Sequence, residues 1–214
     1  MKYSKQAFEK AKKQLTKKGP EYRALLKRHK VEFKPKPLRD PFESLVRAIA
    51  HQQLHGKAAE TILNRMLALF PDKKFPSAED ILTKAPEDLR ACGFSASKVR
   101  SILDIADKTS SGVVPTAKEI RKLSNQEIID RLTTIFGVGK WTVEMLLIFQ
   151  LGRLNIWPVD DFGVRKGFQL WQKKRKFPSP KDLRPIGAHF EPYQTVMALY
   201  LWREADLAKV KKEK

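Results

Sequence analysis

Apolar residues recur at spacings of three and four along almost the whole chain of 214 residues, and runs of strict apolar–polar alternation are scarce. This period matches the α-helix, in which residues i, i+3 and i+4 share one face, whereas a half-buried strand alternates with period two. Pro and Gly breakers cut the pattern into about ten segments of ordinary helix length. They lie at Gly19-Pro20, Lys34–Pro41, Pro71–Pro76, Gly112–Pro115 and Phe177–Pro180. The sequence therefore predicts an all-α fold.

Capping signals mark where several of these helices begin. The run from Asp40 to Glu43 combines a capping acid, a proline at the first helical position and a glutamate three residues after the cap. Thr116 and Ser124 are each followed three residues later by a glutamate, and Ser77 is a weaker cap. Each signal predicts a helix N-terminus.

The length suits one large domain or two small ones that share a core. We expect a single unit made of two helical lobes with a cleft between them. The central lobe spans about 40–150, and the second lobe combines 1–39 with 151–214.

The charge balance indicates a polyanionic partner. The chain has 43 Lys and Arg against 24 Asp and Glu, a formal net charge of +19, and nucleic acid is the foremost candidate. A single cysteine, Cys92, excludes an internal disulfide, a Cys-rich zinc site and a four-Cys iron–sulfur cluster. The Lys-rich N-terminus offers no continuous apolar segment for a signal peptide or a membrane span, so we expect a soluble intracellular protein.

Two glycines separate two apolar helices in the most informative stretch, Leu132–Phe149. A helix over 125–134 leads into the turn, and the next helix begins at Lys140 or Trp141. Because glycine has no side chain, a ligand can approach such a turn closely, and the amides at the N-terminus of the second helix point outward. The turn either holds a DNA phosphate or merely connects two helices, and the net charge favours the phosphate. We assign phosphate binding to Gly137, Val138, Gly139 and Lys140.

A pair of acids follows the second of these helices. Pro158 forces the preceding residue into an extended conformation, so Asp160 and Asp161 lie at the head of a helix that begins near Phe162. Either acid could cap that helix, but one suffices, and the second, Asp161, is then expected to be free to face whatever the glycine turn holds. A carboxylate suits cleavage of an N-glycosidic bond, in which the sugar develops oxocarbenium character.

Four motifs now occur in a familiar order. The motifs together resemble the helix-hairpin-helix DNA glycosylase superfamily, and within it the 3-methyladenine DNA glycosylase II family. In chain order they are AIAHQQLHGKAAETIL, FGVG with KWTVEMLLIF, PVDDFGVRKG and EPYQTVMALYLWR. The resemblance spans roughly Lys34–Asp206. It implies a helix-hairpin-helix motif at a central cleft and a base excision repair enzyme that flips an alkylated purine, of the 3-methyladenine and 7-methylguanine class, out of duplex DNA.

The resemblance also implies residue roles. Asp161 is the catalytic carboxylate, and Asp160 is more structural. Trp141 occupies the position at which bifunctional relatives carry a Schiff-base lysine, so the resemblance implies a monofunctional enzyme that uses water. Trp141 and Trp202 line the base pocket, where electron-rich indoles stack on a cationic methylated purine. Met145 also lines the pocket, at a position that is tyrosine in some relatives.

Three further expectations come from the family. Gln53 or Leu54 fills the gap that the flipped base leaves in the duplex. A monovalent cation is held by the backbone carbonyls of Thr133, Ile135 and Val138, and no other cofactor is expected. The partner is double-stranded DNA with damaged bases, bound by a monomer that does not associate with membranes, in the cytoplasm and nucleoid of a prokaryote or the nucleus of a eukaryote.

Two alternatives stay open. One is a non-catalytic helix-hairpin-helix module that recognises DNA structure through phosphates alone, in which Asp161 is only a helix cap. The other is a lyase-active enzyme that uses Lys140 as its nucleophile. Two aromatic residues near the motifs, Tyr200 and Phe149, are assigned to the core. Ordinary core packing also stays open as the alternative for Trp202 and for Trp141.

Overall fold

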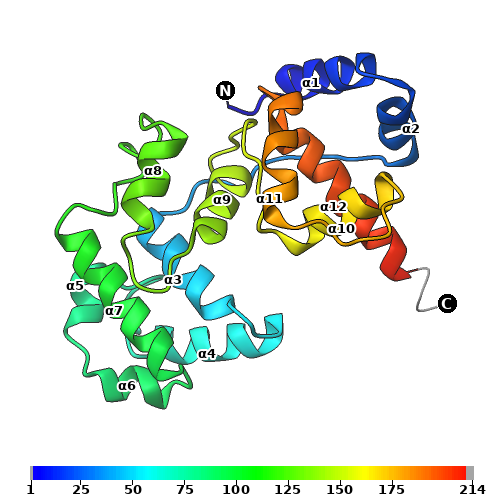
Figure 1. Ribbon diagram of the computed structural model, residues 1–214. Coiled ribbons are helices and arrows are strands. Elements are labelled where there is room, and N and C mark those ends of the chain that lie inside the picture. The colour runs from blue at the N-terminus through cyan, green and yellow to red at the C-terminus, as the bar shows by residue number, and fades with distance from the viewer. Residues whose placement is uncertain (1, 211–214) are drawn as a thin grey trace. The chain divides into compact units, whose positions relative to one another are not determined.

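The computed structural model describes residues 2–210, and their secondary structure is helical apart from one isolated antiparallel bridge between Lys2 and Arg153 (Figure 1). The all-α prediction is confirmed. The chain divides into two compact units. The hairpin unit is Pro37–Leu146, and the terminal unit combines Met1–Lys36 with Leu147–Lys214.

The hairpin unit contains α3 (Pro41–His51), α4 (Gly56–Ala68), α5 (Ala78–Leu82), α6 (Pro86–Ala91), α7 (Ala96–Ser110), α8 (Asn125–Leu132) and most of α9 (Lys140–Phe149). Its core forms where α3 and α5 pack against α7. Leu45, Ile49, Ile102 and Ile105 are fully or almost fully buried there. This packing places the end of α3 beside α7, and the turn that precedes α9 contacts both.

Local capping explains most helix starts in the hairpin unit. The Asp40 side chain accepts the Phe42 amide at 2.9 Å, and both bonds of the predicted Ser124 capping box are present. Thr116 also forms its predicted bonds with Glu119, at 2.9 and 3.3 Å, but residues 117–122 form turns instead of a helix. The prediction of a helix there is wrong, because the first-turn bonds of the cap close only a series of turns before the next capping box at Ser124.

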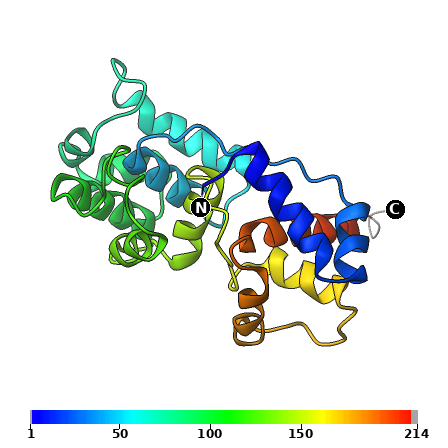
Figure 2. The ribbon, with the colours of Figure 1, turned by 90° about the horizontal axis from the view of Figure 1, so that it is seen from above.

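The terminal unit contains α1 (Lys5–Lys17), α2 (Pro20–Arg28), α10 (Phe162–Trp171), α11 (Pro180–Leu183), a 3₁₀ helix η1 (Pro185–Phe190) and α12 (Gln194–Val210). In this unit α1 lies beside α2, and α10 lies against α12 (Figure 2). The α10–α12 packing is very close at Gly167, where an added Cβ would collide with the Leu201 backbone carbonyl. Tyr200 is 1% exposed in the core, as predicted, and Phe149 packs at the edge of that core.

The described part of the chain contains neither a membrane-spanning helix nor a cluster of side-chain metal ligands. No helix within residues 2–210 combines the length and apolar character that a bilayer crossing requires. Nor do three or more His, Cys, Asp or Glu side chains of these residues gather as metal ligands would.

Candidate active site

The glycine turn before α9 is held in place by its neighbours in the hairpin unit. Gly137 has a φ of +78°, and an added Cβ would collide with the Ser101 hydroxyl of α7. The Gly137 carbonyl accepts the Gln52 side-chain amide at 3.1 Å, and the Phe136 amide donates to Asp104 at 2.6 Å. These contacts fix the turn between the end of α3 and the face of α7.

At the second glycine of the turn, Gly139, no neighbouring side chain requires the residue to be glycine. A Cβ on Gly139 would meet no described atom within 4 Å, so the fold itself leaves open space there. Lys140 begins α9, one of the two predicted starts, and its side chain is half exposed at 3.8 Å from Glu144. The Val138 amide donates to the Ile135 carbonyl at 3.1 Å, and the Val138 side chain is buried. Val138 therefore shapes the turn, while Gly139 and Lys140 face outward.

The two residues predicted to fill the duplex gap lie at an exposed tip between α3 and α4. Gln53 has a φ of +55°, and Leu54 is 39% exposed although it is apolar. Below the tip, the Lys98 ammonium donates to the carbonyls of Ala50 and Gln52 at 2.8 and 2.9 Å. Burial lowers the pKa of Lys98 from its ordinary value. The tip is thus a firmly anchored projection.

Trp141 and Met145 share one face of α9, because they are four residues apart. The Trp141 side chain is 44% exposed, a large fraction for an indole, and Met145 is half-buried. An exposed tryptophan on a helix whose neighbouring residues are mostly buried is a surface on which a planar ligand can stack.

The acid pair lies in the terminal unit, and there one expectation is wrong. Asp161 was expected to be free of capping, but it is itself the N-cap of α10: its Oδ1 accepts the Val164 amide at 2.8 Å. The preceding acid, Asp160, is exposed. The physical reason is position: α10 begins at Phe162, and the residue directly before the first helical residue is the one whose side chain reaches the first-turn amides.

A second donor meets the same carboxylate oxygen. The indole Nε1 of Trp202 donates to Asp161 Oδ1 at 2.7 Å, and Asp161 is 9% exposed. One face of the indole packs near the Phe149 ring, with ring centroids 5.6 Å apart and planes inclined by 33°. Gly163 makes room for the indole, since a Cβ there would lie 2.6 Å from Trp202 Cδ1. Trp202 is therefore an orienting partner of the carboxylate and not only a core residue.

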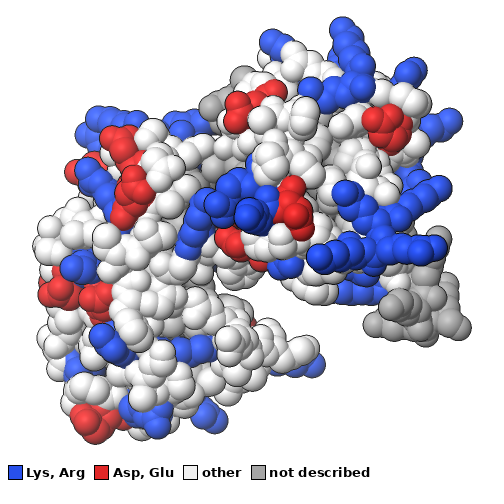
Figure 3. Space-filling view, viewed as in Figure 1, with Lys and Arg blue, Asp and Glu red and all other residues white. Residues whose placement is uncertain are grey.

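The distribution of charge differs between the two units. By the printed sequence, the terminal unit has 27 Lys and Arg against 10 Asp and Glu, whereas the hairpin unit has 16 against 14. Figure 3 shows Lys and Arg gathered around α10 in the terminal unit. The net charges are thus +17 and +2. The overall charge of +19 belongs mostly to the unit that contains Asp161, and it lends little support to phosphate binding by the glycine turn.

Comparison with known proteins gives these residues a context. The family model described as "HhH-GPD superfamily base excision DNA repair protein" matches residues 46–189. Over 170 residues the chain is 44% identical to DNA-3-methyladenine glycosylase 1 of Schizosaccharomyces pombe. This alignment covers 79% of this chain and 75% of that protein. This chain belongs to the HhH-GPD superfamily. The predicted family resemblance is confirmed.

Solved structures support the same membership. The HhH-GPD chain matches the S. pombe 3-methyladenine DNA glycosylase in complex with abasic DNA, with a TM-score of 0.81 and 40% identity over 93% of this chain and 98% of that one. It matches the DNA-3-methyladenine glycosidase of Bacillus halodurans with a TM-score of 0.83 and 29% identity, over 94% and 91% of the two chains. Both matches extend over nearly the whole of each chain.

Sequence reasoning missed several residues that shape this HhH-GPD site. Lys98, Gly163 and Phe149 were given no part in it, although Lys98 binds the backbone directly before Gln53 and the other two contact Trp202. No signal in the sequence marks Lys98, because its partners lie more than 40 residues away. Gly163 carries a weak signal, as a glycine in the first turn of a helix that begins directly after a capping acid.

Proposed function

We propose that this chain is a monofunctional DNA glycosylase of base excision repair that flips alkylated purines out of duplex DNA and hydrolyses their N-glycosidic bonds. Membership of the HhH-GPD superfamily supports this assignment, as does 44% identity to a DNA-3-methyladenine glycosylase. The observation that carries it is the Asp161 carboxylate, oriented by the α10 amide and the Trp202 indole. The partner of the protein is double-stranded DNA with a damaged base.

The carboxylate acts on the sugar. An alkylated purine such as 3-methyladenine or 7-methylguanine is already cationic, so its bond to the sugar breaks readily and leaves an oxocarbenium-like centre. Asp161 stabilises that positive charge and orients the attacking water. Because two donors hold Oδ1 at 2.7 and 2.8 Å, the carboxylate needs little rearrangement when the charge develops.

The base is recognised by stacking. The exposed indole of Trp141 gives a cationic purine an electron-rich surface, and Met145 on the same face adds a polarisable, adaptable contact. Trp202 also stacks on the base, and the edge of its indole is hydrogen-bonded to Asp161. In this arrangement Trp202 couples base recognition to the position of the carboxylate.

The glycine turn and the α3–α4 tip hold the duplex. Gly137, Gly139 and Lys140 bind a phosphate at the N-terminus of α9, where the open space at Gly139 permits close approach. At the tip, Gln53 or Leu54 occupies the space of the flipped base. The carbonyls of Thr133, Ile135 and Val138 are hard oxygen donors of the kind that suits a monovalent cation, which would stiffen the turn. None of these three roles adds chemistry at the sugar.

Product analysis tests this function. Duplex DNA treated with a methylating agent is incubated with the full-length protein, and released bases are separated by chromatography while the strands are analysed with and without alkali. We expect free 3-methyladenine or 7-methylguanine and strands that break only after alkali. Strand breakage without alkali would indicate lyase chemistry, and the absence of any free base would refute the glycosylase.

One observation favours a second candidate, the non-catalytic helix-hairpin-helix module. That alternative requires Asp161 to be a helix cap, and Asp161 does cap α10. The two candidates share the fold and the DNA partner but differ in product, because a binding module releases no base. The Trp202 hydrogen bond favours the glycosylase, since a cap needs no partner beyond the helix amides.

A further inference from the structure

A cavity of about 790 Å³ lies in the terminal unit, lined by α1, α2, the segment 29–34 and α12. Its volume is in the range of small-molecule sites. Lysines dominate its charged lining, with Lys5, Lys12, Lys27, Lys30 and Lys34 against Glu9 and Glu32. Two of them are neutralised, because Lys12 pairs with Glu9 at 3.0 Å and Lys30 with Glu32 at 3.1 Å. The cavity therefore has an excess of positive charge.

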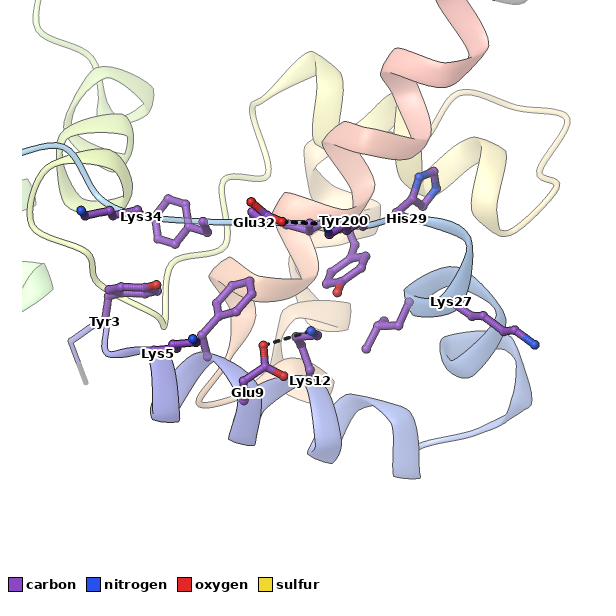
Figure 4. A pocket seen from close by; sticks show the side chains of 14 residues that line it. Tyr3, Lys5, Glu9, Lys12, Lys27, His29, Glu32, Lys34 and Tyr200 are labelled. Carbon is purple, nitrogen blue, oxygen red and sulfur yellow. Dashed lines mark hydrogen bonds and ion pairs between the residues drawn. The ribbon is translucent and has the colours of Figure 1, made fainter.

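Tyr200 of α12 closes this cavity from within. Its side chain is 1% exposed, and Figure 4 shows the ring between the segment 29–34 and α1, with the hydroxyl directed toward Glu9 and Lys12. Within residues 2–210 this hydroxyl forms no hydrogen bond. Burial, and secondarily the charge of Glu9, raise the pKa of Tyr200 to about 12, so the hydroxyl stays protonated and can donate. Because Tyr200 lines the cavity, a ligand bound there can supply the acceptor that this hydroxyl lacks.

The cavity is separate from the candidate active site. Tyr200 and Trp202 are two residues apart on α12, about 200° around the helix, so they point to opposite faces. Trp202 contacts Asp161, whereas Tyr200 faces α1. One wall of the cavity is apolar: Phe8 and Val31 are buried there, and Leu26 is half-buried. This apolar wall can contact the apolar part of a ligand that is larger than a single anion.

We propose that this cavity binds the phosphate group of a nucleotide, with the Tyr200 hydroxyl donating to a phosphate oxygen and Lys5, which forms no ion pair within residues 2–210, contributing to the balance of its charge. A phosphate suits the site better than a carboxylate because it carries more charge and more acceptor oxygens. The apolar wall then takes the nucleoside. The same group is found on a free nucleotide and on the phosphorylated end of a DNA strand, and both sources offer the chemistry that the cavity recognises.

Calorimetric titration of the full-length protein tests this site. The probes are thymidine 5′-monophosphate, thymidine, and a short single strand with and without a 5′-phosphate. Tyr200→Phe removes only the hydroxyl, Lys5→Gln with Lys12→Gln removes two cavity charges, and Lys10→Gln with Lys13→Gln is the matched control on the outer face of α1. Thermal melting verifies that each variant is folded.

We expect the phosphorylated probes to bind and thymidine not to bind. Tyr200→Phe should weaken binding about tenfold, as should the Lys5/Lys12 variant, whereas the Lys10/Lys13 control should change it less than about twofold. Tighter binding of the phosphorylated strand than of the mononucleotide assigns the ligand to a strand end, and the reverse assigns it to a free nucleotide. Unchanged binding by Tyr200→Phe, or an equal loss in the Lys10/Lys13 control, overturns the proposal. Base release from damaged duplex should persist in Tyr200→Phe, and its parallel loss would count against a separate site.

Discussion

Substituting Gly163 by alanine should slow base release without unfolding the protein. The added Cβ would lie 2.6 Å from Trp202 Cδ1, so the indole must retreat by about 0.8 Å to reach even a tight contact of 3.4 Å. That shift stretches its 2.7 Å hydrogen bond with Asp161 to the limit of hydrogen bonding. A hydrogen bond to a charged group contributes about 1.5–3 kcal/mol, so we expect single-turnover base release to fall roughly ten- to hundredfold.

The same substitution should leave the fold intact. Gly163 lies in the first turn of α10 with a φ outside the left-handed region, and alanine favours helix by about 0.5–1 kcal/mol over glycine. The melting temperature therefore changes little. In a Trp202→Phe background, which already lacks the hydrogen bond, Gly163→Ala should cost little further activity. Full turnover by Gly163→Ala alone, or additive losses in the double variant, would refute this reasoning.

Three other predictions concern the turn, the chemistry and an acidic residue. Gly137→Ala should lower the free energy of unfolding by about 1–3 kcal/mol and should also lower duplex affinity, whereas Gly139→Ala should lower duplex affinity alone. Thermal melting measures the stability and fluorescence anisotropy the affinity, and equal losses of melting temperature in the two variants would contradict this contrast. Borohydride should trap no covalent DNA adduct in the wild type, and an adduct that disappears in Lys140→Gln would indicate a lyase instead. The Lys73 ammonium, and after it the Ser77 amide, lower the pKa of Asp80 to about 2, so the stabilisation from Asp80 is present above its ordinary pKa of 3.8 and is lost as the pH falls toward 2. In Lys73→Met the Asp80 carboxyl should titrate higher by NMR, and an unchanged midpoint would show that Lys73 is not the cause.

What the sequence predicted well depends on local geometry. The glycine turn, the helix start at Lys140 and the Ser124 capping box each follow from a few adjacent residues. Backbone preference and first-turn hydrogen bonds determine such features almost independently of the rest of the chain. The exception is Thr116, whose capping bonds form although turns follow instead of a helix.

What the sequence did not predict depends on long-range contacts. Trp202 meets Asp161 across 41 residues, and Lys98 reaches the Gln52 carbonyl across 46. No spacing rule encodes such pairs, so neither the hydrogen bond between Trp202 and Asp161 nor the role of Lys98 was predicted. The capping of α10 by Asp161 is a local feature and follows from its position directly before Phe162. The net charge of the whole chain likewise did not indicate which part of the molecule carries the positive charge, and only the division into two units showed this.

The central claim is that the charge of Asp161 drives base release, and the most direct measurement is single-turnover base release by Asp161→Asn beside Asp160→Asn. Asparagine caps a helix about as well as aspartate, so the first variant removes the charge while α10 keeps its start. The account predicts that Asp161→Asn loses roughly a hundredfold or more in rate with unchanged duplex affinity, whereas Asp160→Asn stays near wild type. Base release by Asp161→Asn at the wild-type rate would contradict it.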